Sequence, residues 1–375
     1  MNVFELIMTD YTLQVVSLGS ALLGIISGVL GSFAVIRKES LLGDAVSHSA
    51  LPGIALAFLF TGTKNTEILL LGALTSGLLS TAIIMGISKY SKIKFDSALA
   101  LILSVFFGGG LVLLTYIQKI PNANQAGLEK FIFGQASTVL LRDVKIIALL
   151  GAGLLLLVAL FWKEFKIVSF DIDYAQSLGF DTKKITALLF AMIVTSIIIG
   201  LQTVGVILMS AMLTAPAVAA RQWTDKLSVM VLLSALFGAL AGLGGTVLSS
   251  VVSRLPTGPM IVIIISLIVL ISLTLAPNRG LIWRFLRQKN NKKSISADQS
   301  LANLYHLKLD SPQSQGYEIP LIRPNLAQKK NGEQIVKEQL AWLTSKNLVR
   351  EVNPSRWSIT DKGMEYIDTY FKEEV

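Results

Sequence analysis

Residues 41–58 read LLGDAVSHSALPGIALAF, and the rest of the chain is organised around this stretch. It is apolar enough to enter a bilayer, yet it contains Asp44 and His48. On a helix, two residues four positions apart lie on one face, about one turn apart. A carboxylate oxygen and an imidazole nitrogen placed in this way can hold a divalent cation. Ionisable groups inside a membrane span are costly and usually functional, so this pair is a candidate metal site.

A structural role for the same pair is the alternative. Asp44 follows Gly43 and could be the N-cap of a helix that begins at Ala45. His48 would then be an ordinary buried histidine, hydrogen-bonded back to the Asp44 carboxylate. Residue chemistry alone leaves both interpretations open.

The rest of the chain is dominated by long apolar runs. Of its 375 residues, 53% are hydrophobic and only 15% are charged. Runs of about 20 apolar residues predict an all-α polytopic membrane protein with eight or nine transmembrane helices. Eight spans are expected at residues 12–36, 41–60, 67–88, 97–117, 144–162, 185–208, 227–251 and 260–275, and residues 209–220 would form the ninth. Pro52 and Gly53 are expected to bend or break the second span.

Cysteine and histidine are scarce in this chain. There is no cysteine, which excludes disulfides, thiolate zinc sites and cysteine nucleophiles. The only histidines are His48 and His306. A metal site in one copy is therefore poor in nitrogen ligands and needs carboxylates, water, backbone carbonyls or a second subunit.

The net charge of +9 is concentrated in short loops and in the C-terminal part. The positive-inside rule places basic loops in the cytosol, beside lipid headgroups, and it places the C-terminus there too. The basic residues that set this orientation are Arg37, Lys38, Lys89, Lys92, Lys94, Lys163, Lys166, Lys183, Lys184, Arg221 and Lys226, and residues 279–293. The N-terminus has no basic segment before its first apolar run, so that run is expected to be a true span.

Residues 41–58 resemble the signature of the integral-membrane permeases of zinc, manganese and iron ABC importers. A second stretch, residues 170–180 (FDIDYAQSLGF), places Asp171, Ala175 and Gly179 in a D-x-x-x-A-x-x-x-G pattern. This pattern is similar to the cytosolic coupling helix of such permeases, which contacts the ATPase subunit. The number of spans agrees, and so does the run TVGVILMSAMLTAPAVAA from Thr203. The resemblance covers about residues 10–285.

The resemblance implies a transport subunit rather than an enzyme. Asp44 and His48 match the metal-pathway residues of the family, and residues 171–179 match its coupling segment. The cargo would be a divalent metal, manganese first and zinc or iron next, moved by alternating access with no permanently bound cofactor. The partners implied are a separate ABC ATPase, a second permease subunit (identical or paralogous) and an extracytoplasmic metal-binding protein, in a bacterial plasma (inner) membrane. The chain itself has no P-loop sequence.

Two other classes remain as alternatives: an ATP-independent metal transporter and a membrane-tethered DNA-binding regulator. The coupling pattern disfavours the first. The number of spans disfavours the second, since anchoring needs fewer.

Composition divides the chain into three parts. Residues 1–277 form the transmembrane permease domain, 278–296 a basic juxtamembrane linker, and 297–375 a small α+β cytosolic domain. In the last part, helices are expected at 297–309, 332–346 and 362–371, with Asp361 as the cap of the third. Residues 348–352 and 357–360 predict a β-hairpin, and 311–324 a loop. This order resembles a winged-helix domain like those of iron- and manganese-dependent repressors.

Charges of both signs alternate on this C-terminal domain. Lys329, Lys330, Lys337, Arg350 and Arg356 could contact DNA phosphates, and three glutamates lie among them: Glu333, Glu338 and Glu351. The mixture favours a protein-contact or regulatory role over DNA binding. His306 and Asp310 form a second i, i+4 pair, which is typical of a solvated surface more than of a metal site.

Overall fold

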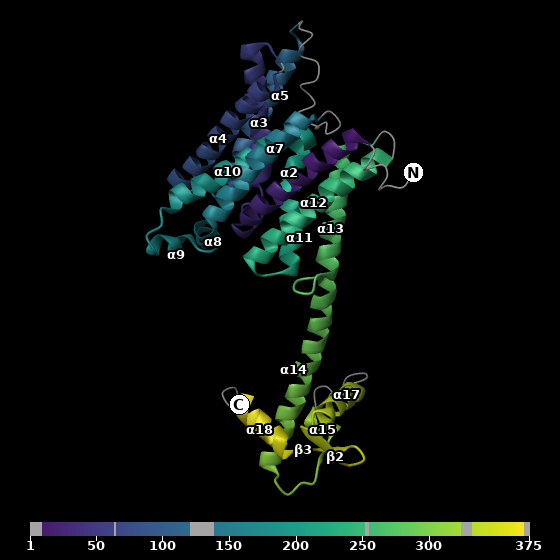
Figure 1. Cartoon of the computed structure of the whole chain (residues 1–375). Helices are drawn as coiled ribbons and strands as arrows, with labels where there is room; N and C mark the ends of the chain where they lie inside the picture. The colour runs from purple at the N-terminus through teal and green to yellow at the C-terminus, as the bar shows by residue number, and fades with distance from the viewer. Residues whose placement is uncertain (1–9, 64, 121–138, 252–254, 324–331, 371–375) are drawn as a thin grey trace. The chain divides into compact units, whose positions relative to one another are not determined.

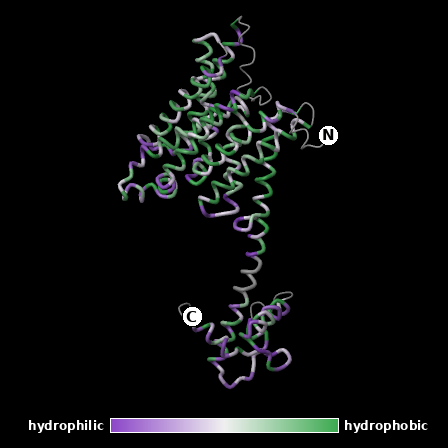
Figure 2. The backbone as a smooth tube through the Cα atoms, viewed as in Figure 1, coloured by the Kyte–Doolittle hydropathy of each residue, from purple (hydrophilic) through white to green (hydrophobic). Residues whose placement is uncertain are grey.

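The computed structural model describes residues 10–63, 65–120, 139–251, 255–323 and 332–370 (Figure 1). The chain divides into two compact units, Met1–Gly280 and Leu281–Val375. Hydrophobic residues dominate the helices of the first unit, whereas hydrophilic residues are frequent in the second (Figure 2). Each unit has its own hydrophobic core.

The first unit is a bundle of long helices with two short ones inserted. The long helices are α2 (Tyr11–Ile36), α3 (Leu42–Thr61), α4 (Thr66–Tyr90), α5 (Phe95–Gln118), α7 (Leu141–Leu160), α10 (Thr182–Val204), α11 (Val206–Trp223), α12 (Leu227–Val251) and α13 (Thr257–Leu275). The short helices are α8 (Trp162–Phe170) and α9 (Ile172–Ser177). Within the described residues, eight helices are long and apolar enough to cross a membrane. The predicted polytopic helical fold is confirmed.

The sixth span ends earlier than the sequence predicted. An apolar run to Leu208 was expected, but Gly205 has φ +88° and separates α10 from α11. Only glycine adopts such an angle without strain, so the break lies inside a run whose hydropathy does not change. The proline-containing segment 209–220 belongs to α11, which continues through Pro216 and carries the fully buried Met209.

Small residues join α2 to α12. Gly24 faces Gly238, and Gly242 faces Ser20 at similarly close range. The Ser234 hydroxyl on α12 donates to the Gly28 carbonyl on α2, at 2.7 Å. In lipid, where no hydrophobic force drives helices together, close approach of this kind supplies the packing energy. Within the described residues, α2 and α12 thus form the most extensive helix–helix contact of the first unit.

The second unit combines helices with a small sheet. Its elements are α14 (Leu281–Asp310), β1 (Tyr317–Glu318), α15 (Ile319–Ile322), α17 (Gly332–Ser345), β2 (Val349–Asn353), β3 (Arg356–Ile359) and α18 (Asp361–Tyr370). The strands are antiparallel in the order β1-β3-β2. Leu304 on α14, Leu340 on α17 and Trp357 on β3 meet in its core. The predicted hairpin and the helix at 332–346 are confirmed.

Three details of this unit differ from the prediction. The residues predicted as a linker (278–296) and the first helix are largely one helix, α14. The predicted loop 311–324 contains β1 and α15, which are too short to leave a periodic pattern. Asp361 is the first residue of α18 rather than its cap, and the Thr360 hydroxyl instead accepts a hydrogen bond from the Gly363 amide at 3.1 Å.

Candidate metal site

Asp44 and His48 lie in the first two turns of α3. The helix begins at Leu42, so Asp44 is its third residue and not the N-cap. The capping interpretation is therefore wrong: the residue at the cap position is Leu41, which makes no side-chain cap bond. A carboxylate in the first turn is favoured by the positive end of the helix dipole. That effect offsets part of the cost of a charge in an apolar segment.

The two side chains point toward each other. His48 Nε2 lies 3.4 Å from Asp44 Oδ1, and their side chains are 15% and 41% exposed. The Phe107 ring of α5 packs edge-on against the imidazole, with ring centroids 4.6 Å apart and an angle of 71°. His48 Nδ1 is buried and has no hydrogen-bond partner within the described part of the chain. The imidazole is therefore held by packing, with Nε2 directed to the carboxylate.

Neighbouring helices fix the backbone of α3 around the pair. A Cβ on Gly43 would lie 2.8 Å from Leu213 Cδ2 of α11, so the start of α3 is pressed against that helix. The Ser210 side chain of α11 also interacts with Asp44. On the other side, the Ser76 hydroxyl of α4 donates to the Ser49 carbonyl at 2.6 Å. These contacts hold the backbone of α3 on both sides of the pair.

Pro52 affects the same turn of helix without breaking it. α3 continues from Leu42 to Thr61 through Pro52, so of the two predicted outcomes, a bend or a break, the break is wrong. Proline has no N–H, and the carbonyl that loses its intrahelical donor is that of His48, four residues earlier. A backbone oxygen next to the imidazole is thereby released from the helix ladder.

One stripe of α3 is only partly covered by the rest of the chain. Leu41, Leu56 and Phe60 are exposed, Asp44 is partly exposed, and with His48 and Pro52 between them these positions recur at three- and four-residue spacing. His48 and the partly buried Pro52 lie on the same stripe. A carboxylate that is 41% exposed on an apolar helix is unfavourable against lipid. This stripe therefore belongs against water or against another protein surface.

Two ligands do not complete a metal site. Among the residues that the structure describes, no group of three or more His, Asp or Glu side chains could hold a metal ion. Divalent transition metals take four or more ligands, often tetrahedral for zinc and six-coordinate for harder ions. The missing ligands must come from water, backbone oxygens or another chain.

The second predicted site, residues 171–179, forms the short helix α9. The Asp171 carboxylate caps it by accepting from the Tyr174 amide at 2.9 Å, and Gly179 ends the turn with φ +84°. Ala175 is fully buried, so it packs α9 onto its own chain rather than facing outward. Four large apolar side chains of this segment are exposed, those of Phe170, Ile172, Tyr174 and Leu178. Polar residues, among them Asp173, Gln176 and Ser177, are exposed beside them, so the outward surface is mixed. Large apolar groups that stay exposed together on a short helix are candidates for a contact surface.

Two neighbours of these sites were not predicted from the sequence. Phe107 lies in an apolar run in which one aromatic residue looks like any other. Arg37 was assigned only to a basic loop, yet its side chain is buried near both ends of the segment that carries α9.

A family model matches most of the first unit. The model described as "ABC 3 transport family" matches residues 9–276, which is most of the first unit. The chain belongs to the ABC 3 transport family. It is thus a multi-pass membrane protein of a transport system, as the eight candidate spans require.

Several named members of the family are close relatives. The chain is 51% identical over 289 residues to the zinc transport system membrane protein TroC of Treponema pallidum, covering 77% of this chain and 97% of that protein. It is 41% identical over 353 residues to the manganese transport system membrane protein MntC of Bacillus subtilis, covering 94% of this chain and 80% of that protein. The second alignment is longer than the family region, so this relative shares part of the second unit.

A solved structure shows the same architecture. The structure of PsaBC from Streptococcus pneumoniae in complex with Fab matches with a TM-score of 0.66 and 32% sequence identity. The match covers 76% of this chain and 98% of that chain. The polytopic helical fold predicted from the apolar runs, and the permease family indicated by the resemblance of residues 41–58, are therefore both confirmed.

Proposed function

We propose that this ABC 3 family chain is the permease subunit of an ATP-driven importer and that its cargo is a divalent transition metal. The observation that carries the proposal is the Asp44–His48 pair, 3.4 Å apart on a partly exposed stripe of a helix long and apolar enough to span a membrane. Manganese is the first candidate cargo, with zinc and then iron after it. One carboxylate and one imidazole suit all three metals. The names of the relatives support the first two.

The exposed stripe of α3 supports a second permease subunit, identical or paralogous. Two such stripes facing each other would offer two carboxylates and two imidazoles, enough for a four-ligand site. The burial of Asp44 against a protein partner would also remove it from lipid. An extracytoplasmic metal-binding protein would deliver the ion to this interface.

The residues at the site would act in a simple way. A neutral His48 offers the Nε2 lone pair, and the Asp44 carboxylate offers oxygen, so together they replace part of the water shell that the ion loses. Phe107 keeps the imidazole plane fixed and excludes water from that side. Alternating access then requires only that the helices carrying the pair move apart on one side of the membrane at a time.

The apolar surface of α9 supports docking of a separate ATPase. Phe170, Ile172, Tyr174 and Leu178 would enter a groove of that subunit, while the buried Ala175 holds α9 to its own chain. Nucleotide hydrolysis would belong to the ATPase chain. The chain would lie in a bacterial plasma membrane. Its basic loops support a cytosolic position for α9 and for the C-terminus, because such loops bind the anionic lipid of the cytoplasmic leaflet.

The second unit is proposed to be a winged-helix module that contacts protein. The strand order β1-β3-β2 with α17 before the hairpin supports the winged-helix assignment. Residues 297–375 contain ten Lys or Arg and eleven Asp or Glu, so the module has no excess positive charge. DNA binding depends strongly on such an excess. Arg356 in the hairpin is already paired with Glu318, at 2.8 Å.

Cellular metal content tests the function. Cells that depend on this transporter in metal-poor medium would carry wild type, Asp44→Ala, His48→Ala or the control Glu67→Gln, at matched membrane expression. A selective fall of one metal in both site variants, with the control unchanged, supports the importer and identifies its cargo. Unchanged metal content in both site variants would overturn it. Metal uptake that persists without ATP hydrolysis would favour an ATP-independent transporter.

A further inference from the structure

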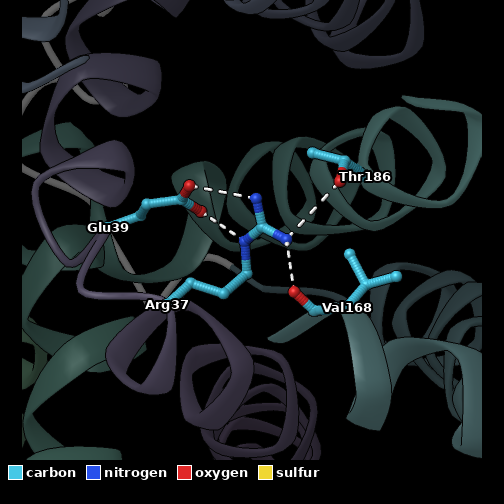
Figure 3. A network of polar contacts seen from close by, with 4 residues as sticks. All are labelled: Arg37, Glu39, Val168 and Thr186. Carbon is cyan, nitrogen blue, oxygen red and sulfur yellow. Dashed lines mark hydrogen bonds and ion pairs between the residues drawn. The ribbon is translucent and has the colours of Figure 1, made fainter. Parts of the chain in front are cut away.

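The turn between α2 and α3 contains a largely buried ion pair. Arg37 Nε lies 2.7 Å from Glu39 Oε2, and Arg37 Nη2 lies 3.0 Å from Glu39 Oε1, a bidentate arrangement (Figure 3). The two side chains are only 5% and 16% exposed. Lys38 between them has φ +61°, a left-handed conformation that costs energy for a residue with a side chain. Desolvation makes buried ion pairs weak contributors to stability, so this pair invites a functional explanation.

The free side of the guanidinium faces both segments that flank α9. Arg37 Nη1 lies 3.5 Å from the Val168 carbonyl oxygen of α8 and 3.5 Å from the Thr186 hydroxyl oxygen of α10. Its Cζ lies 5.3 Å from the ring centroid of Phe190 on α10. α9 is joined to the end of α8 and to the start of α10 and contacts both. The Arg37 side chain thus contacts the helix before α9 and the helix after it.

Glu39, the second member of the ion pair, is hydrogen-bonded to the start of the helix that carries the candidate metal site. The Glu39 carbonyl accepts from the Leu42 amide at 3.0 Å, which ties the turn to the first residue of α3. From Leu42 to His48 the helix rises only about 9 Å, at about 1.5 Å per residue. Glu39 lies just before this helix, and a short helical segment moves as a rigid body, so any movement of the turn that shifts Leu42 would also shift Asp44 and His48.

The contacts of Arg37 differ in strength, so some of them can break while others remain. The ion pair to Glu39 is short and charge-assisted, whereas the two contacts to α8 and α10 are at the long limit of hydrogen bonding. A small shift of either helix would strengthen or break those contacts without breaking the ion pair.

We propose that Arg37 is a positioning residue that couples movement of α9 to Asp44 and His48 through its ion pair with Glu39. Arg37 touches neither the metal ligands nor the ATPase-facing surface. Its role is to make the α2–α3 turn follow α8 and α10 when a docked ATPase moves α9. This inference rests on the proposed function, because it assumes that α9 receives the movement and that Asp44 and His48 hold the cargo.

The test compares metal uptake with ATP hydrolysis in the same preparation. The full chain would be reconstituted with its ATPase and binding protein in proteoliposomes, and manganese and zinc would be the cargo probes. The main variant is the double substitution Arg37→Met with Glu39→Leu, which removes the pair without leaving a single buried charge. Arg37→Lys keeps the charge but loses the two-pronged geometry. The exposed Glu67–Arg142 pair, changed to Gln at both positions, is the matched control.

The expected result is uncoupling. The double variant should lose at least tenfold in metal moved per ATP hydrolysed, while its metal affinity, ATPase co-purification and thermal stability stay near those of wild type. The metal moved per ATP by Arg37→Lys should lie between the values of wild type and the double variant. The control pair should match wild type. An unchanged uptake-to-hydrolysis ratio, or a proportional loss of uptake, hydrolysis and assembly, would overturn the proposal. If wild type moves neither metal with ATP, the proposed function fails, whatever the variants do.

Discussion

Gly24 of α2 and Gly238 of α12 lie backbone against backbone: a Cβ on either would be 2.1 Å from the carbonyl oxygen of the other. No side chain, not even a methyl group, fits there without moving a helix. The helix that makes this contact, α2, leads directly into the turn before α3, which carries the candidate metal site.

Gly238→Val is therefore expected to destabilise the membrane unit severely. Overpacking a close helix contact costs about 3 kcal/mol or more when backbone atoms must move. Gly153→Val on α7 is the control, since a Cβ at Gly153 meets nothing within 4 Å. Thermal denaturation of both variants in detergent measures the difference. Equal melting temperatures would show that the α2–α12 contact is not a determinant of the fold.

Gly110 supports the candidate metal site from behind. A Cβ on it would lie 2.8 Å from Leu51 Cβ and 3.0 Å from Pro52 Cδ, on the α3 turn that follows His48. Gly110→Ala should push α5 away from α3 and take Phe107 off the His48 ring. We expect manganese affinity of the purified transporter to fall about tenfold, or about 1.4 kcal/mol, by titration calorimetry.

The matched control for that change is Gly108→Ala, two residues away on the same helix, where a Cβ meets nothing within 4 Å. It should leave manganese affinity near the wild-type value. If both variants lose affinity equally, α5 acts through its helix propensity or through another surface, and the contact behind His48 is unimportant.

The outward residues of α9 give a prediction about assembly. Replacing both Tyr174 and Leu178 with Ala should weaken co-purification of the ATPase. Truncation of an interface hot spot, a class in which Tyr is enriched, costs about 2 kcal/mol or more, so the expected change is about 10- to 100-fold. Ser177→Ala on the same helix should leave it unchanged. Wild-type recovery of the ATPase with the double variant would place the docking surface elsewhere.

The sequence predicted what depends on long apolar runs and short spacings. The spans follow from the thickness of a bilayer, and the Asp44–His48 contact follows from the geometry of one helical turn. Both could therefore be predicted from the sequence. Gly205 was not recognised as a boundary, because a change of backbone angle leaves hydropathy unchanged. Arg37 was missed for another reason: Val168 and Thr186 are 131 and 149 residues away along the chain, and no local pattern records such contacts.

The second unit offers the last prediction, because it has its own core. Leu340 of α17 is fully buried there, at 0% exposure, whereas Ile335 on the same helix is 44% exposed. Leu340→Ala should destabilise this unit by about 2–5 kcal/mol, through lost burial and the cavity left behind. Ile335→Ala should cost within about 0.5 kcal/mol. Hydrogen exchange of the full chain measures both: amides of β2 and β3 should exchange faster in Leu340→Ala only, while those of α2 and α12 stay protected. If α2 and α12 lose protection together with β2 and β3, the two units unfold as one, and the division at Gly280 has no thermodynamic meaning.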